Sequence, residues 1–153
     1  MREHTSYSLR PLESSDLPAV AEISMLGVYS DWSFETFTSC FKENYLNLVL
    51  VDEHEVLGFL ISTLNVDEIE ILNLGIHPAK WRQGLADFLL SSFIEFARQH
   101  QVQRIHLEVN KTNLPAIALY QKHHFAQVGS RQNYYAAKEG AQDALLFSLE
   151  LNS

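Results

Sequence analysis

The sequence predicts one α/β (α+β) domain over residues 1–153, with a central mixed β-sheet flanked by helices. A chain of 153 residues suits a single domain, and an apolar fraction of 46% can supply its core. Apolar patterns of strand and helix type follow one another in the order β-α-α-β-β-β-α-β-α-β-β. The two late strand–helix–strand units indicate that some strands pair in parallel.

The first half of the chain is expected to hold four strands and two helices. The strands are expected at residues 7–12, 48–51, 56–64 and 69–76. The Ser-Ser-Asp stretch at 14–16 can cap a first helix, with Pro18 in its first turn, and Ser33 can cap a second helix over about 34–41. The apolar stripe of the first helix comprises Leu17, Val20, Ala21, Ile23 and Leu26.

The second half is expected to begin with a long amphipathic helix after a loop at 79–84. Its apolar positions recur with helical spacing and comprise Leu85, Phe88, Leu89, Ser92, Phe93 and Phe96. A shorter helix is expected at 114–122. The remaining strands are expected at residues 104–109, 125–130 and 144–151.

Charge and composition narrow the class of protein. The formal net charge is -8, whereas proteins that bind nucleic acid directly are usually basic. This charge serves solubility in the simplest interpretation, and in an alternative one it attracts a cationic substrate. Cys40 is the single cysteine, which excludes a disulfide framework. With no signal peptide and no membrane-spanning run, we expect a cytoplasmic protein that contacts neither membrane nor nucleic acid.

The turn that opens the long helix, residues 82–86, has the features of an anion site. The first N–H groups of a helix have no partners within it, and the helix dipole is positive there. Gly84 lets a ligand approach the backbone, and Arg82 adds a positive charge. These features suit a pyrophosphate, although a plain loop-to-helix turn with one glycine also explains this segment.

Glu108 and Tyr120 form a candidate acid–base pair. Strand alternation puts His106 and Glu108 on one face of the 104–109 strand. Asn113 can cap the next helix, and Tyr120 lies two turns later on the same face. A strand-end carboxylate and a tyrosine on the adjoining helix can exchange protons with a substrate. A solvated glutamate and a packed tyrosine are the simpler alternative.

Other reactive residues give weaker indications. Of the adjacent Tyr134 and Tyr135, only one can point inward from a strand, so the other can line a groove. The histidines show no metal-ligand spacing, so no metal is expected. Cys40 lies far along the chain from these segments and has no base beside it, which disfavours an acyl-enzyme route.

Several of these segments, taken in order, resemble the GNAT superfamily of N-acetyltransferases. Residues 72–78 followed by 82–86 resemble its acetyl-CoA motif, and 107–125 resembles the second half of that pattern. Residues 32–37, 45–47 and 131–135 resemble the RimI group in particular. Members of that group acetylate the N-terminal alanine of a small-subunit ribosomal protein. The resemblance covers nearly the whole chain.

The resemblance implies the GNAT fold, with a splayed acetyl-CoA-binding strand, and a role for each candidate residue. Glu108 would be the general base and Tyr120 the general acid. The residues expected to bind acetyl-CoA are Leu74, Gly75, Ile76, Arg82, Gln83, Gly84, Leu85, Ala86, Asp87 and Asn113. The residues expected to flank a peptide substrate are Trp32, Ser33, Tyr134 and Tyr135.

Four residues depart from the family pattern. Trp81 stands where Gln or Arg usually opens the acetyl-CoA motif, and Asp87 stands where RimI relatives often carry a basic residue. His123-His124 replaces a common Leu-Gly pair. Because histidine tolerates positive φ better than most residues, we expect this turn to survive.

The resemblance implies acetyl transfer from acetyl-CoA to the free N-terminal amine of a basic protein or peptide. The expected substrate is a ribosomal protein that begins with alanine. Two alternatives stay open. One is a GNAT enzyme acting on a lysine side chain or a small amine, and the other is a non-catalytic acyl-CoA-binding module of the same fold. The presence of both Glu108 and Tyr120 disfavours the second.

Overall fold

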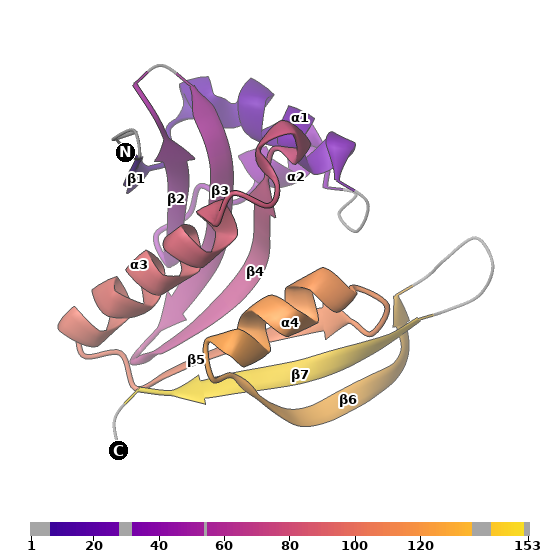
Figure 1. The fold of residues 1–153 in the computed structure, drawn as a ribbon. Coiled ribbons are helices and arrows are strands. Elements are labelled where there is room, and N and C mark those ends of the chain that lie inside the picture. Colours follow the sequence, from indigo (N-terminus) through magenta and orange to yellow (C-terminus); the bar gives the residue numbers. More distant parts are fainter. Residues whose placement is uncertain (1–6, 28–31, 54, 136–141, 152–153) are drawn as a thin grey trace, which may run out of the picture. The chain divides into compact units, whose positions relative to one another are not determined.

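The computed structural model describes residues 7–27, 32–53, 55–135 and 142–151. In this part of the chain seven strands form a mixed sheet in the order β1-β2-β3-β4-β5-β7-β6 (Figure 1). The strands are β1 Ser8–Pro11, β2 Tyr45–Val51, β3 Val56–Asn65, β4 Glu68–Ile76, β5 Arg104–Asn110, β6 Ala126–Tyr135 and β7 Gln142–Glu150. The helices are α1 Leu17–Leu26, α2 Phe34–Thr38, α3 Leu85–Gln99 and α4 Leu114–Lys122, with short 3-10 turns η1 Ser14–Asp16 and η2 Pro78–Lys80. The predicted order of elements is confirmed.

The chain forms two compact units. The first comprises residues 1–63 and 73–89, and the second comprises 64–72 and 90–153. Strand β4 and helix α3 each contribute residues to both units. The expectation of one domain over residues 1–153 stays a prediction.

In the first unit, α1 and α2 pack onto the strands through a small aromatic core. The Phe37 ring of α2 meets the Phe59 ring of β3 edge-on at 5.2 Å. A Cβ added to Gly75 would lie 2.9 Å from the Phe59 ring and 3.6 Å from Ile23 of α1. Gly75 is therefore a packing glycine, because any side chain would push β4 away from this core.

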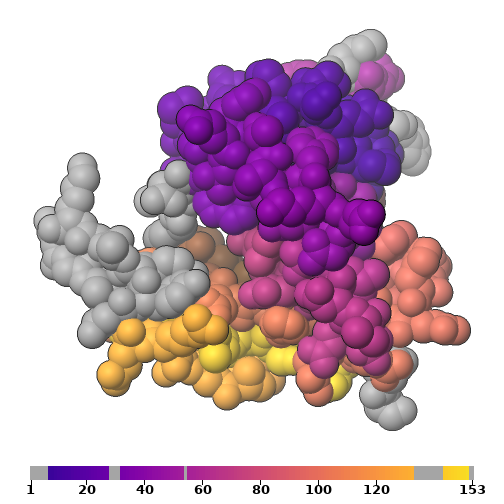
Figure 2. All heavy atoms as spheres, turned by 180° about the vertical axis from the view of Figure 1, so that it is seen from behind, coloured from indigo at the N-terminus to yellow at the C-terminus, as the bar shows by residue number. Residues whose placement is uncertain are grey.

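Helix α1 follows the predicted stripe in part. Leu17, Val20 and Ile23 are buried and Ala21 is half-buried, whereas Leu26, the last residue of the helix, is 48% exposed. In the space-filling view, the indigo to violet atoms of the N-terminal segment that includes α1 and α2 lie together (Figure 2). The expected cap is also different: no side chain caps α1, since the Asp16 carboxylate instead binds Arg10 and the backbone N–H of Glu13.

In the second unit, the predicted parallel pairing is confirmed. Residues Glu68–Ile71 of β4 pair in parallel with Arg104–Leu107 of β5. The last strand, β7, then inserts between β5 and β6 and is antiparallel to both. Alternation along β5 buries Ile105, Leu107 and Val109 and leaves the intervening polar residues half-exposed.

Helix α3 is rotated relative to the predicted stripe. Phe88 is 38% exposed, with its ring 6.3 Å from that of Tyr7. The buried positions are Leu85, Leu89, Leu90, Phe93, Ile94 and Ala97. The periodicity predicted the helix correctly. Its predicted buried face is partly wrong, because Ser92 and Phe96 of the stripe are only half-buried.

Strand β6 is longer than the sequence predicts. It runs from Ala126 to Tyr135, so Arg131 lies within the strand. The turn that precedes it is as expected, since His124 has a φ of 72° and replaces the usual glycine.

Candidate functional site

The loop after β4 is held by hydrogen bonds that the sequence pattern did not suggest. The His77 N–H donates to the Leu57 carbonyl at 2.8 Å, and the Trp81 indole N–H donates to the Ile76 carbonyl at 2.7 Å. Trp81, a departure from the family pattern, thus ties the loop back to the strand end. Leu74 and Gly75 are half-buried, and Ile76 is buried.

The predicted anion turn has an unusual backbone. Arg82 and Gly84 have φ values of 65° and 78°, both left-handed. The first hydrogen bond of α3 runs from the Phe88 N–H to the Gly84 carbonyl at 3.0 Å, so the preceding N–H groups have no acceptor within the helix. Apart from Gly84 itself and its chain neighbours, no heavy atom lies within 4 Å of the point where a Gly84 Cβ would be.

The turn therefore offers open space beside helix N–H groups, which is the geometry that a phosphate group needs. Arg82, Gln83 and Gly84 are exposed. Of the remaining residues in this segment, Leu85 is buried, and Ala86 and Asp87 are half-buried. The residues present thus fit a pyrophosphate.

The Trp32-Ser33 pair opens α2 in the first unit. The Trp32 ring lies 5.2 Å from the Phe37 ring, at an interplanar angle of 57°. The Ser33 hydroxyl accepts the Thr36 N–H at 3.2 Å, as the predicted N-cap. The Ser33 hydroxyl therefore has a structural role in capping α2, in addition to the substrate contact that is expected of it.

In the second unit, β5 presents Glu108 on the polar face of the sheet. Its side chain is 18% exposed, and its Oε1 lies 3.0 Å from the Arg131 Nη2 of β6. A largely buried carboxylate needs an opposite charge or hydrogen bonds, and the guanidinium supplies one. Sequence reasoning did not find this ion pair, because the two residues lie on different strands.

Helix α4 carries Asn113 and Tyr120 as predicted. The Asn113 Oδ1 caps the helix by accepting the Ala116 N–H at 3.2 Å. Tyr120 is 6% exposed, and its ring meets that of Phe125 at 5.4 Å and 63°. The tyrosine ring is thus fixed by packing. Tyr134 and Tyr135 lie on β6, where Tyr135 pairs with Gln142 of β7.

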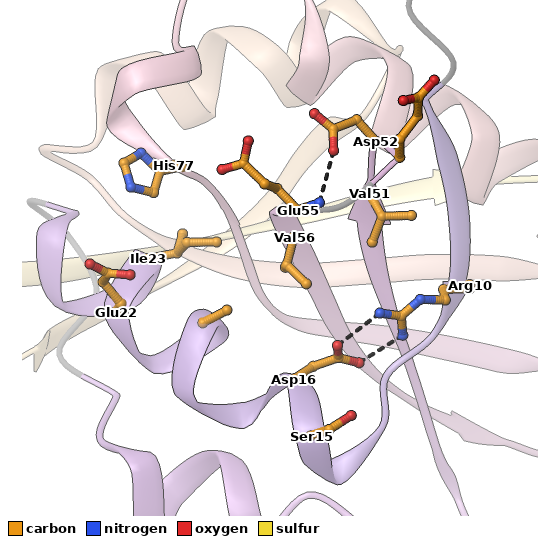
Figure 3. A pocket seen from close by; sticks show the side chains of 12 residues that line it. Arg10, Ser15, Asp16, Glu22, Ile23, Val51, Asp52, Glu55, Val56 and His77 are labelled. Carbon is orange, nitrogen blue, oxygen red and sulfur yellow. Dashed lines mark hydrogen bonds and ion pairs between the residues drawn. The ribbon is translucent and has the colours of Figure 1, made fainter.

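A cavity of about 540 Å³ lies in the first unit, and none of the predicted site residues is among those that line it (Figure 3). Arg10 and Asp16 form a two-point ion pair in it, with both contacts at 2.8 Å. The lining residues are Arg10, Ser15, Asp16, Ala19, Glu22, Ile23, Val51, Asp52, Glu53, Glu55, Val56 and His77. Among the described residues that line the cavity, Arg10 is the only arginine, and it is paired with Asp16. Four further carboxylates line the cavity, so its charge disfavours an anionic cofactor.

The described residues contain no group of three or more His, Cys, Asp or Glu side chains able to hold a metal ion. No helix in the described part of the chain is long and apolar enough to cross a membrane.

The chain is similar to known proteins over most of its length. The sequence profile of the acetyltransferase (GNAT) family matches residues 7–125. The chain is 34% identical over 145 residues to the ribosomal protein bS18-alanine N-acetyltransferase of Escherichia coli, which covers 95% of this chain and 98% of that protein.

Solved structures give the same result. The crystal structure of the ribosomal-protein-S18-alanine N-acetyltransferase from Escherichia coli superposes with a TM-score of 0.91 and 33% identity, covering 97% of this chain and 96% of that chain. The Arabidopsis thaliana NAA60 structure in complex with acetyl-CoA has a TM-score of 0.83 at 22% identity, covering 97% of this chain and all (100%) of that one. At that identity the second likeness concerns the fold alone.

Proposed function

The chain belongs to the acetyltransferase (GNAT) family, and from that premise we propose that it acetylates the N-terminal α-amine of a ribosomal protein beginning with alanine. The observation that carries this proposal is the similarity to the bS18-alanine N-acetyltransferase of Escherichia coli, which extends over 95% of this chain. A match of that length includes the segments that hold Trp32, Glu108 and Tyr120.

Acetyl-CoA is the proposed acyl donor, and it supplies an activated thioester when bound. The turn at 82–86 would hold its pyrophosphate, through the N–H groups at the start of α3 and the charge of Arg82. The open space beside Gly84 supports this assignment, because it leaves the backbone accessible. The rest of the cofactor would contact Asp87 and the neighbouring residues of the acetyl-CoA motif. It would also contact Asn113.

Glu108 would accept a proton from the substrate amine, directly or through water. An α-amine has a pKa of about 7.7–8.0 in model compounds, so only a minority of it is neutral at pH 7. Tyr120 would donate a proton to the departing thiolate, whose thiol has a pKa of about 8.5. Backbone N–H groups at 74–76 would stabilise negative charge developing on the acyl oxygen.

The substrate is proposed to be basic and to react at its N-terminus. The net charge of -8 favours encounter with a cationic chain, by an attraction that salt weakens. A lysine side chain, with a pKa of about 10.4, is neutral at pH 7 roughly two orders of magnitude less often than an α-amine. Trp32 and the tyrosines Tyr134 and Tyr135 would flank the peptide. Acting on a ribosomal protein would require the enzyme to be in the cytoplasm.

A competition experiment tests this function. The enzyme is given acetyl-CoA with an alanine-starting basic peptide, the same peptide blocked at its N-terminus but containing lysine, and spermidine. We expect mass spectrometry to find the acetyl group on the α-amine of the unblocked peptide. Preference for the blocked peptide or for spermidine would identify a lysine or small-amine acetyltransferase instead. Acetyl-CoA binding without turnover of any amine would identify a non-catalytic module.

A matched peptide separates chemistry from attraction. An alanine-starting acidic peptide should react more slowly than the basic one at low salt, and the difference should shrink as salt is raised. Equal rates at low salt would remove the electrostatic argument while leaving the α-amine assignment in place.

A further inference from the structure

The ion pair between Arg131 and Glu108 depends on an irregularity in β6. Glu108 of β5 is opposite Leu146 of β7, and Leu146 is opposite Gly129 of β6. Opposite residues in antiparallel strands share a face, so these three positions lie on one face of the sheet. Arg131 is two residues beyond Gly129, opposite Ala144, and is therefore on the same face as Glu108.

A bulge places Arg131 there. The register shifts between Gln127, opposite Phe147, and Gly129, opposite Leu146, so Val128 is the extra residue and is 66% exposed. Without that shift Arg131 would be opposite Asp143, and its side chain would point to the other face. A bulge that redirects one side chain is typical of the surroundings of functional sites.

We infer that Arg131 is a positioning residue for the reaction, and that it holds Glu108 through Oε1 so that the other carboxylate oxygen accepts the substrate's proton. This inference rests on the proposed function, because it takes Glu108 as the general base. A glutamate side chain has three rotatable bonds, and a base must meet its proton at hydrogen-bond distance. The contact at 3.0 Å removes much of that freedom.

The exposure of the two partners separates this role from a purely structural one. The Glu108 side chain is 18% exposed, but that of Arg131 is 55% exposed. An ion pair with one partner largely in water contributes less to folding than a fully buried pair does. Removing the guanidinium should therefore leave the fold intact and change mainly the orientation of the carboxylate.

The first test compares Arg131→Ala with a matched control. We expect kcat for an alanine-starting peptide to fall by about ten- to a hundredfold, the usual cost of a misplaced reacting group. The peptide KM and the acetyl-CoA affinity should stay within about twofold, and Arg131→Lys should recover part of the rate. The control is Arg104→Ala, which removes an arginine paired with Glu68 and Glu150 on the same sheet and should leave kcat unchanged.

The second test asks whether Arg131 acts through Glu108. In a Glu108→Gln background, Arg131→Ala should lower kcat by less than about twofold, because the group it positions is absent. The same fold-loss in both backgrounds, a loss confined to KM, or an Arg104→Ala enzyme as slow as Arg131→Ala would each overturn the inference. If Glu108→Gln alone keeps near wild-type kcat, the general-base assignment in the proposed function is wrong as well. Circular dichroism and thermal unfolding confirm that each variant is folded.

Discussion

The candidate cofactor turn of the first unit is built mainly from backbone, whereas the candidate acid–base site of the second unit is built from side chains. In the first, the features at 82–86 are left-handed φ values, open space at Gly84 and the start of α3. In the second, Glu108, Arg131 and Tyr120 come from two strands and a helix. The backbone site is contained in one short stretch of chain, whereas the side-chain site depends on the register of three strands.

This difference predicts unlike responses to mutation. A backbone site fails when bulk or charge enters the space that it leaves open, and the expected loss is one of binding. A side-chain site fails when one functional group is removed, and the expected loss is one of rate with binding retained. If the two units divide the work in this way, changes in the first should weaken acetyl-CoA binding and changes in the second should lower kcat.

The largest expected effect is on turnover in the second unit. Glu108→Gln and Tyr120→Phe should each lower kcat by roughly 10²–10⁴-fold, the usual contribution of acid–base groups. Tyr120→Phe keeps the ring that packs on Phe125, so its loss reports on the hydroxyl. Steady-state kinetics measures kcat, and calorimetry should find acetyl-CoA affinity unchanged.

A matched control for this prediction is Glu70→Gln. Glu70 is another half-exposed strand glutamate of the second unit, opposite His106 in the β4–β5 pairing. Its replacement should leave kcat within about twofold. Near wild-type turnover in either test variant would remove that residue from the mechanism, and loss of acetyl-CoA affinity in Glu108→Gln would break the division between the units.

A smaller effect, on binding, is expected in the first unit. Gly84→Glu should weaken acetyl-CoA binding at least about tenfold, or 1.4 kcal/mol, because a carboxylate would enter the space proposed for the pyrophosphate. The matched control is Gly27→Glu, the same change in the same unit. Gly27 has an ordinary φ of -77°, and a Cβ there would meet only normal contacts at 3.5 Å or more.

Calorimetry on the two folded glycine variants decides this second prediction. Equal affinities for acetyl-CoA would show that the turn at 82–86 does not bind the pyrophosphate. Equal losses would point to a general effect of added negative charge rather than to this turn.

The same contrast explains how much the sequence could predict. The order of elements and the bounds of α4 follow from local periodicity and caps, such as Asn113, and both are confirmed. The turn at 82–86 is equally local. The insertion of β7 between β5 and β6 is a long-range pairing that no local pattern encodes.

The Arg131–Glu108 ion pair was missed for a related reason. The sequence placed Arg131 after a strand rather than inside β6, and the face it occupies depends on the extra residue Val128. A bulge shifts every later side chain to the other face, and its position is not visible in alternation alone. The indole bond of Trp81 was likewise hidden, because the family pattern marks that position only as a departure.

The smallest expected effect concerns stability, and it sharpens the comparison because it should leave both candidate sites untouched. Asp16 is 5% exposed in the first unit and pairs with Arg10. The hydrogen bond from Arg10 lowers the pKa of Asp16, against the effect of burial and with help from the Glu13 N–H.

A carboxyl whose folded pKa lies below the unfolded value of about 3.9 contributes stability above that pH and loses it as pH falls toward the folded value. Asp16→Asn should therefore cost about 1–2 kcal/mol at pH 7, and less near pH 3. Thermal unfolding at several pH values measures this, with the Asp67→Asn variant as an exposed control, and kcat of the folded Asp16→Asn enzyme at pH 7 should match wild type. Parallel stability curves for wild type and Asp16→Asn down to pH 3 would show that this ion pair does not hold the first unit together, and a reduced kcat would show that the scaffold and the candidate sites are not separable.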